Sequence, residues 1–391
     1  MIKYLGSKRA LLPTLLDAVG SVRGARTVAD LFSGTARVGH ALKRAGYRVL
    51  SNDHNAYAAT SARCYVQADR EDVETDARRL IAELDALPGV AGYFTQTYCL
   101  DARYFRPENG ARIDAIREGI ARKGLAPELE AVLLVALMEA ADRVDSTAGV
   151  QMAFLKRWSR RSGRTLRLRC PDILPRAPHG KGAAFALDAT EAAQRLEADV
   201  AYLDPPYNRH SYLGNYHLWE TLILGDRPAT YGVAKKRVDC RERRSAFNSK
   251  LRAAEALERT LRATSAPTVV VSHSDEGFLD GASIEAMLLR LWDGAARVYV
   301  VERAHPRYMG ARIGIYSPSG VKVGRVGRLV NVERLYVATR VEIDEARLGA
   351  RAIPPCGPER PAPSAAGEAG LEVAEREQRV ERRGAVEVER A

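Results

Sequence analysis

The tetrapeptide Asp204-Pro205-Pro206-Tyr207 is the part of this 391-residue sequence whose residue types best suit chemistry. It directly follows the apolar run Val200–Leu203, which predicts a buried strand. The two consecutive prolines fix φ and remove two backbone donors, so they hold the loop stiffly. Loops at strand ends commonly carry active sites. We therefore expect the carboxylate of Asp204 and the ring of Tyr207 to hold a flat amine.

A glycine turn near the N-terminus lies between a predicted strand at residues 27–32 and a predicted helix that ends at Gly46. Backbone N–H groups and the positive end of the helix dipole favour an anion there, so the turn suits a ligand that carries a carboxylate. The spacing from Gly34 to Gly39 departs from the full dinucleotide fingerprint. Taken alone, the turn is therefore equally consistent with a structural role.

Two acidic residues make the expected ligand more specific. Asp53 ends the next predicted strand, about twenty residues after the turn, where an acidic side chain commonly accepts both ribose hydroxyls of a nucleoside. Asp188 follows a later strand, where it either accepts from an adenine amino group or caps the following helix. The glycine turn together with Asp53 predicts a nucleoside cofactor.

The elements that must position these residues predict an α/β fold. Apolar strands alternate with amphipathic helices, a pattern typical of a parallel sheet, and shorter apolar runs near the C-terminal end predict antiparallel strands that close it. The predicted strands are 27–32, 47–51, 184–187, 200–203 and 268–272, followed by the closing strands 298–302, 314–316 and 335–338.

An insertion interrupts this alternation. Helical periodicity at 73–87, 111–122 and 127–144 predicts a mainly helical region. From Ala346 onward, large apolar residues almost disappear, which predicts a disordered, charged tail. The expected organisation is a catalytic domain over 1–68 and 183–345, an inserted DNA-recognition region over 69–182 and a tail over 346–391.

The formal charge of +11 is concentrated in two segments. Residues 156–176 hold eight Lys or Arg against one Asp, and residues 235–252 hold eight against two acidic residues. Such clusters are typical of polyanion binding. Solvated arginines on an ordinary surface remain the alternative for either cluster taken alone.

Other features narrow the class of protein. The five cysteines are scattered and form no Cys-x-x-Cys pair, which predicts reduced thiols and neither disulfides nor a metal site. The longest nearly apolar stretch, Ala131–Met138, is far shorter than the roughly 20 residues that a membrane span needs. The basic N-terminus is not followed by a clean signal-peptide core, so we expect a cytoplasmic protein.

Several motifs, in this order, resemble the D12 class of N6-adenine DNA methyltransferases, which includes the Dam methylases. Tyr4-Leu5-Gly6-Ser7-Lys8 resembles the family's Tyr-x-Gly-(Gly/Ser)-Lys motif, residues 30–39 resemble its cofactor loop, and residues 204–207 match its catalytic tetrapeptide. The resemblance covers about residues 1–65 and 184–340. One departure is Thr35-Ala36, where many related loops have a second glycine.

The resemblance implies a Rossmann-like, S-adenosylmethionine-dependent sheet and methyl transfer to the N6 amine of an adenine flipped out of a specific duplex DNA sequence. In that family Asp204 and a carbonyl of Pro205 or Pro206 would accept the amino hydrogens, and Tyr207 would stack on the base. By the same resemblance, the cofactor would contact Tyr4, Lys8, Asp30, Phe32, Gly34, Asp53 and Asp188. The basic segments supply the expected DNA contacts, which are Lys156, Arg157, Arg160, Arg161, Arg164, Arg241, Arg243 and Arg244.

Two alternatives to this activity stay open at the level of sequence. A methyltransferase of the same fold could act on RNA or protein, and an inactive chain of this fold could serve as a DNA-binding partner. The intact Asp204 and cofactor loop argue against the inactive partner. A nucleoid-associated monomer, with a cognate restriction endonuclease as a conceivable partner, fits the family best.

Overall fold

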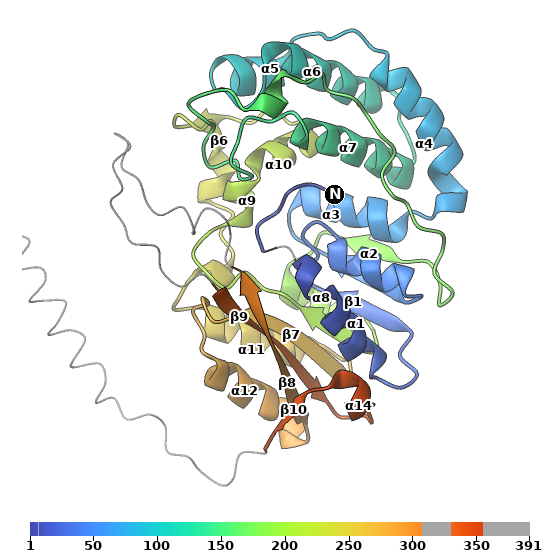
Figure 1. Ribbon diagram of the computed structural model, residues 1–391, viewed down its shortest axis with the longest axis vertical. Coiled ribbons are helices and arrows are strands. Elements are labelled where there is room, and N and C mark those ends of the chain that lie inside the picture. The colour runs from blue at the N-terminus through green and yellow to red at the C-terminus, as the bar shows by residue number, and fades with distance from the viewer. Residues whose placement is uncertain (7, 307–329, 355–391) are drawn as a thin grey trace, which may run out of the picture. The chain divides into compact units, whose positions relative to one another are not determined.

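The computed structural model describes residues 1–6, 8–306 and 330–354. Within these ranges the central sheet has eight strands in the order β10-β8-β9-β7-β4-β1-β2-β3 (Figure 1). The strands from β7 to β3 pair in parallel, and β10, β8 and β9 pair in antiparallel fashion at the other end. This confirms the predicted Rossmann-like sheet with antiparallel closing strands. The strands are β1 (Thr27–Asp30), β2 (Arg48–Asn52), β3 (Ala183–Phe185), β4 (Val200–Leu203), β7 (Thr268–Ser274), β8 (Arg297–Pro306), β9 (Val330–Thr339) and β10 (Arg351–Ile353), and a separate hairpin joins β5 (Thr230–Tyr231) to β6 (Lys236–Arg237).

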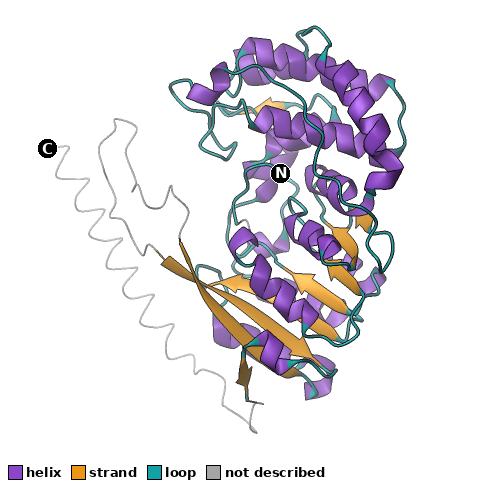
Figure 2. Ribbon diagram, turned by 45° about the vertical axis from the view of Figure 1, so that its right-hand side comes forward, coloured by secondary structure: helices purple, strands orange, loops and turns teal. Residues whose placement is uncertain are grey.

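Helices lie on both faces of the sheet, as Figure 2 shows. The α-helices are α1 (Leu12–Gly20), α2 (Arg37–Arg44), α3 (Ala56–Ala62), α4 (Arg70–Asp85), α5 (Tyr93–Thr95), α6 (Pro107–Arg122), α7 (Pro127–Asp142), α8 (Ala189–Arg195), α9 (Tyr212–Asn215), α10 (His217–Leu224), α11 (Ala253–Ala263), α12 (Gly281–Leu289) and α14 (Glu345–Leu348). Both α6 and α7 begin with proline, whose missing N–H costs nothing at a first helical position.

Alternate residues of each strand enter two different cores. On β4, Val200 and Tyr202 pack in the cluster that contains helices α1, α2 and α3, whereas Ala201 and Leu203 pack in the cluster that contains α8, α11 and α12. This alternation follows from the two-residue period of a strand. The result is a three-layer arrangement in which the sheet is buried on both faces.

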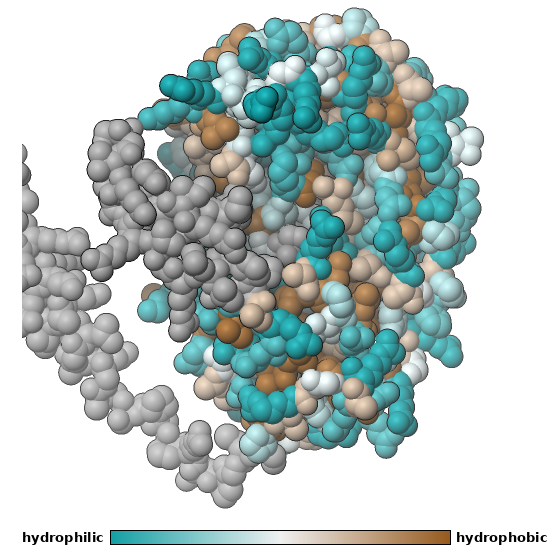
Figure 3. All heavy atoms as spheres, viewed as in Figure 1, coloured by the Kyte–Doolittle hydropathy of each residue, from teal (hydrophilic) through white to brown (hydrophobic). Residues whose placement is uncertain are grey.

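The inserted helices share a core with the sheet. Val132 and Leu137 of α7 belong to the same hydrophobic cluster as Val28 of β1 and Val200 of β4. The apolar stretch at the centre of α7 is buried from Ala131 to Met138. Hydrophilic side chains cover most of the outer surface of this helical region in the view of Figure 3. The insertion is mainly helical, as predicted, but it is not a separate hydrophobic unit.

The structure corrects the predicted start of the tail. Residues beyond Ala346 complete α14 and form β10, which pairs antiparallel with β8. Leu348 and Ile353 are buried, so two apolar side chains and the pairing with a sheet edge suffice to fold a segment of polar composition. The predicted strand at 314–316 and the predicted tail from 355 onward lie outside the described residues.

The helices of the described ranges all lack the combination of length and apolar character that a membrane crossing requires.

A substitution in α7 tests whether the insertion and the sheet unfold together. Leu137 is fully buried, so Leu137→Ala should lower the free energy of unfolding by about 2–5 kcal/mol in a single transition. Urea unfolding followed by circular dichroism and by tryptophan fluorescence should give coincident curves. Leu251→Ala is the matched control, because Leu251 is 93% exposed, and it should leave stability unchanged. Two separate transitions would contradict a shared core.

Candidate active site

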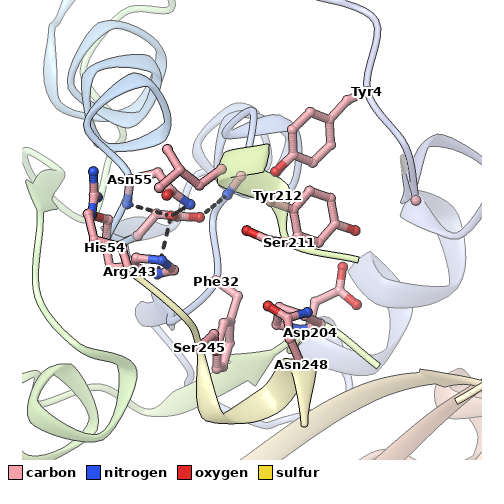
Figure 4. A pocket seen from close by; sticks show the side chains of 15 residues that line it. Tyr4, Phe32, His54, Asn55, Asp204, Ser211, Tyr212, Arg243, Ser245 and Asn248 are labelled. Carbon is pink, nitrogen blue, oxygen red and sulfur yellow. Dashed lines mark hydrogen bonds and ion pairs between the residues drawn. The ribbon is translucent and has the colours of Figure 1, made fainter. Parts of the chain in front are cut away.

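Three carboxylates meet at the carboxyl edge of the sheet because β4, β1 and β2 are neighbours. Asp30 ends β1, Asp53 follows β2 and Asp204 follows β4. A pocket opens at this edge, and Asp53 and Asp204 both line it. Figure 4 shows Asp204 on one side of the pocket and His54, Asn55 and Arg243 on the other.

Asp204 is held by contacts to one of its two carboxylate oxygens. Ser272 Oγ donates a hydrogen bond of 2.6 Å to Asp204 Oδ1, and Lys8 Nζ lies 3.2 Å from the same oxygen. Tyr202 OH donates to Ser272 Oγ at 3.2 Å, which orients the serine. In the described part of the chain no hydrogen bond is formed to Asp204 Oδ2. Burial raises the pKa of Asp204, against the opposing effects of Lys8 and Ser272.

The ammonium of Lys8 is shared between two carboxylates. Its Nζ lies 3.1 Å from Glu333 Oε2 as well as 3.2 Å from Asp204 Oδ1, and the lysine is buried. Burial alone would lower the pKa of Lys8, but the two carboxylates raise it above its ordinary value. The lysine therefore stays charged. It contacts the predicted catalytic carboxylate, and its predicted contact with a cofactor remains untested.

The ring of Tyr207 lies beside this charged group. Lys8 Nζ is 5.9 Å from the ring centroid, and His273 packs edge-on at 6.2 Å. Burial raises the pKa of Tyr207 to about 12, so the phenol is neutral at physiological pH. The backbone carbonyl of Tyr207 accepts from Phe278 N at 2.9 Å, and His273 Nε2 bonds the carbonyl of Leu279 at 2.9 Å. These bonds fix the loop that follows the prolines.

Stacked tyrosines form one wall of the pocket. The ring of Tyr4 lies nearly parallel to those of Tyr212 and Tyr216, with centroid distances of 5.1 and 4.6 Å. Tyr4 OH lies 3.1 Å from Tyr57 OH, and Leu5 N donates to Tyr216 OH at 2.6 Å. The N-terminal segment is thereby fastened across the sheet edge. Tyr4 and Tyr212 line the pocket, as Figure 4 shows.

Asp53 holds the glycine turn together. Its Oδ2 accepts from Gly34 N at 3.0 Å, and its Oδ1 accepts from the backbone and side-chain nitrogens of Asn55 at 3.0 and 3.1 Å. Gly34 has a φ of +51°, and a Cβ there would lie 3.2 Å from the Tyr4 ring. The turn therefore requires glycine for both backbone conformation and space. Phe32, another predicted cofactor contact, also lines the pocket.

The departure at Thr35-Ala36 has a conformational cost. Ala36 adopts a φ of +60°, a left-handed conformation that glycine occupies more readily, and its side chain is fully buried. The family's second glycine would therefore fit this backbone without strain. Here the methyl group fills the core between the turn and the start of α2.

Asp30 is a buried carboxylate that has no cationic partner among the described residues. Both of its oxygens are buried, and neither has a hydrogen bond of good geometry. Burial and the nearby charges of Asp204 and Asp53 raise the pKa of Asp30 to about 8, against the opposing effect of the backbone N–H groups of Phe32 and Gly39. A buried carboxyl without a cation is costly, so its position beside Asp53 and Asp204 favours a site for a cationic group.

Asp188 lies apart from this group. Its Oδ1 accepts from Thr190 N at 2.9 Å, so the carboxylate caps α8. It is exposed and does not line the pocket. Of the two roles considered for Asp188, the helix cap is the one whose geometry is present, and the adenine contact stays a prediction.

Two of the predicted DNA contacts bind carboxylates of the protein itself. Arg161 Nε donates to the buried Asp145 at 2.6 Å. Arg243 donates to Glu220 at 2.8 Å and to the carbonyl of His54 at 3.1 Å, and the Glu220 side chain is fully buried. The other predicted DNA contacts are exposed, namely Lys156, Arg157, Arg160, Arg164, Arg241 and Arg244.

A second, polar groove adjoins the pocket and shares Ser211, Ser245 and Asn248 with it. One predicted DNA contact, Arg244, is among the basic residues that line this groove. The other basic residues in the lining are Arg209, His210, Lys236 and Arg252. Two signals in the sequence could have found them: Arg209 and His210 follow Asn208 just after the tetrapeptide, and Lys236 and Arg252 belong to the basic cluster at 235–252. The groove supplies a positively charged path that leads to Asp204.

Comparison with known proteins decides the family. Residues 4–262 match the model of the D12 class N6 adenine-specific DNA methyltransferases. The chain belongs to this family. It is therefore a DNA adenine methyltransferase, and the predicted resemblance is confirmed.

Similar proteins include several restriction-modification methylases. The type II methyltransferase M.NlaIII of Neisseria lactamica is 30% identical over 302 residues, which is 74% of this chain and 88% of that protein. The type II methyltransferase M.FokI of Planomicrobium okeanokoites is 31% identical over 305 residues, but this chain spans only 46% of its length. The modification methylase StsI of Streptococcus sanguinis is 28% identical, again over 46% of its length.

Arg243 and Arg244 of the methyltransferase form a matched pair for experiment. Arg243→Ala should lower the free energy of unfolding by about 3 kcal/mol, because it leaves the buried Glu220 without its cation and with only the hydrogen bond from Tyr57 N. Arg244→Ala should preserve stability to within about 0.5 kcal/mol, since Arg244 is exposed and donates only to a backbone carbonyl. Denaturant unfolding measures both. If Arg244 contacts a phosphate, its loss should also reduce the salt dependence of duplex affinity by about one unit of slope.

The raised pKa of Asp30 predicts a specific pH dependence. An unfolded aspartate titrates near about 3.9, whereas Asp30 titrates near 8 in the folded protein. Between these values the folded state holds a proton that the unfolded state lacks, so this residue's contribution to stability falls as pH rises from 4 to 8. Asp30→Asn should remove the effect, and its Tm advantage over the parent protein should grow from pH 5 to pH 8. A constant Tm difference would contradict the shift.

Proposed function

We propose that this methyltransferase moves a methyl group from S-adenosylmethionine to the N6 amine of an adenine that is flipped out of a specific sequence in duplex DNA. The observation that carries the proposal is that Asp204 lines the same pocket as Gly34 and Asp53. The carboxylate that would accept from an amine and the glycine turn expected to bind a nucleoside cofactor therefore line one cavity.

The residues on the cofactor side fit S-adenosylmethionine. The buried carboxylate of Asp30, which has no cationic partner among the described residues, suits the cationic amino group of its methionine part, next to the glycine turn at Gly34. Asp53 stands where the ribose hydroxyls would lie, and Tyr4 would close over the ligand. When bound, this cofactor supplies an electrophilic methyl group on a sulfonium.

Asp204 would activate the amine as an acceptor. The N6 lone pair of adenine is delocalised into the ring, so the nitrogen must become more tetrahedral to attack. Asp204 Oδ1 is engaged by Ser272 and Lys8, which leaves Oδ2 to accept one amino hydrogen. A carbonyl of Pro205 or Pro206 would accept the other. The carboxylate then stabilises the positive charge that develops on nitrogen during the transfer.

Tyr207 would hold the flipped base. A base must leave the duplex stack to reach a pocket of this kind, at a cost of a few kcal/mol. Stacking on an aromatic ring contributes roughly 1–3 kcal/mol per base, which is similar in size. The ring of Tyr207 is neutral and packs near Lys8 Nζ and the ring of His273, so it is pre-positioned for this contact.

The basic groove would carry the DNA backbone toward the pocket. Arg209, Lys236 and Arg252 line it together with Arg244, and the ring of Tyr231 lies under the guanidinium of Arg241 at 3.9 Å. Phosphate contacts position a duplex without reading its sequence. The inserted region at 69–182 is our proposal for the part that reads the sequence.

The names of the similar proteins indicate what kind of partner this chain would have. Several are named as type II or modification methylases, so we propose that this chain protects DNA against a cognate restriction endonuclease. A monomer in the cytoplasm, associated with the nucleoid, completes the proposal.

Substitution of the tetrapeptide tests this function. Asp204→Ala should abolish methyl transfer, because no other group replaces the acceptor, whereas Tyr207→Ala should slow it by about tenfold to a hundredfold through lost stacking. The assay is transfer of a radiolabelled methyl group to genomic DNA, bulk RNA and protein. Label only in RNA or protein, or substantial activity of Asp204→Ala, would refute the proposal.

A further inference from the structure

Glu333 is a buried acidic residue that the proposed chemistry does not use. It lies on β9, outside residues 4–262 that match the family model. Its side chain is 9% exposed, and the contact that holds it is the 3.1 Å pair with Lys8. Burying a carboxylate is costly even when it is paired, so its position calls for a reason.

The order of the strands places Glu333 at the same sheet edge as Asp204. β9 runs antiparallel to β7, so the beginning of β9 lies beside the end of β7, where Glu333 is opposite Ser274 (Figure 1). Glu333 occupies the same face of β9 as Leu335 and Val337, which pack in the cluster containing α1, α2 and α3. Lys8 approaches from that face.

The three charged groups form one connected unit. Lys8 Nζ lies 3.2 Å from Asp204 Oδ1 and 3.1 Å from Glu333 Oε2. The unit carries one positive and two negative charges, so its net charge is −1. Without Glu333, the ammonium would neutralise Asp204 alone and weaken that carboxylate as an acceptor. Among the described residues, Tyr207 and His273 also interact electrostatically with Glu333, and Arg303 of β8 is its partner in the strand register.

We propose that Glu333 is a positioning residue for methyl transfer, which holds Lys8 against Asp204 and keeps a net negative charge beside the amine as positive charge develops on it. Glu333 acts through Lys8 and does not touch the substrate. The inference rests on the role proposed above for Asp204. It adds a residue of β9, which is far from Lys8 in the sequence, to the catalytic site.

The central test is Glu333→Gln, which preserves shape and removes the charge. Its rate of methyl transfer in single-turnover conditions should fall by about tenfold or more, because a desolvated charge near the reacting atoms is lost. Affinities for S-adenosylmethionine, by calorimetry, and for duplex DNA, by fluorescence anisotropy, should stay within about twofold of the parent protein. Glu333→Asp should recover part of the rate.

Two further variants separate an electrostatic role from a structural one. Glu302→Gln is the matched control, since Glu302 lies on the neighbouring β8 but is exposed and pairs with Arg334, and it should leave the rate unchanged. Lys8→Met removes the group through which Glu333 acts. Adding Glu333→Gln to Lys8→Met should therefore lower the rate by a smaller factor than Glu333→Gln alone lowers the rate of the parent protein.

An unchanged rate in Glu333→Gln would overturn the inference, as would a loss of rate from Glu333→Gln in the Lys8→Met background as large as its loss in the parent protein. Parallel losses of stability, binding and rate in Glu333→Gln and Glu333→Asp would also overturn it, because they would show a purely structural role. The activity of Asp204→Ala shows separately whether the proposed function itself fails. If Asp204→Ala is inactive and Glu333→Gln is fully active, only the role of Glu333 fails.

Discussion

The burial of acidic side chains is the constraint on which the rest of this structure depends. Three adjacent strands lead to acidic residues at one sheet edge, and the charge of each is balanced differently. Asp204 is compensated by a lysine and a serine, and Asp53 by the backbone N–H groups of Gly34 and Asn55. Asp30 has no cationic partner among the described residues, and its pKa is raised accordingly. These differences fit the roles proposed above, with Asp204 as an acceptor, Asp53 as the residue that orders the glycine turn and Asp30 as the residue that suits a cationic group.

The same constraint explains why distant segments converge on this edge. The N-terminal residues cross it to bring in Lys8, fixed by the stack of Tyr4 on Tyr212 and Tyr216. The loop after β6 crosses it to bring Arg243 onto the buried Glu220 of α10. The inserted helices contribute apolar surface to the core on the same face. Charge compensation at the edge and burial of the core on this face therefore both depend on contacts between segments that are distant in the sequence.

Sequence reasoning reached the parts of the site that are local. An acid just after an apolar strand is a local signal, and it pointed to Asp53 and Asp204, whereas Asp30 was predicted through the resemblance of the glycine-turn motif. The partner of a charged side chain is not local, so Arg161 and Arg243 were predicted as DNA contacts although they pair with buried Asp145 and Glu220. Glu333 was missed for the same reason, because only the antiparallel insertion of β9 next to β7 brings it to the site.

The separation of Lys8 and Glu333 in the sequence also determines when the site can first form during synthesis. These two residues are 325 positions apart in the chain, yet their side chains touch. During synthesis the N-terminal strands and helices leave the ribosome long before β9 does. A nascent chain can therefore bury most of its core while its catalytic edge is still incomplete, and DNA modification must await nearly the whole polypeptide.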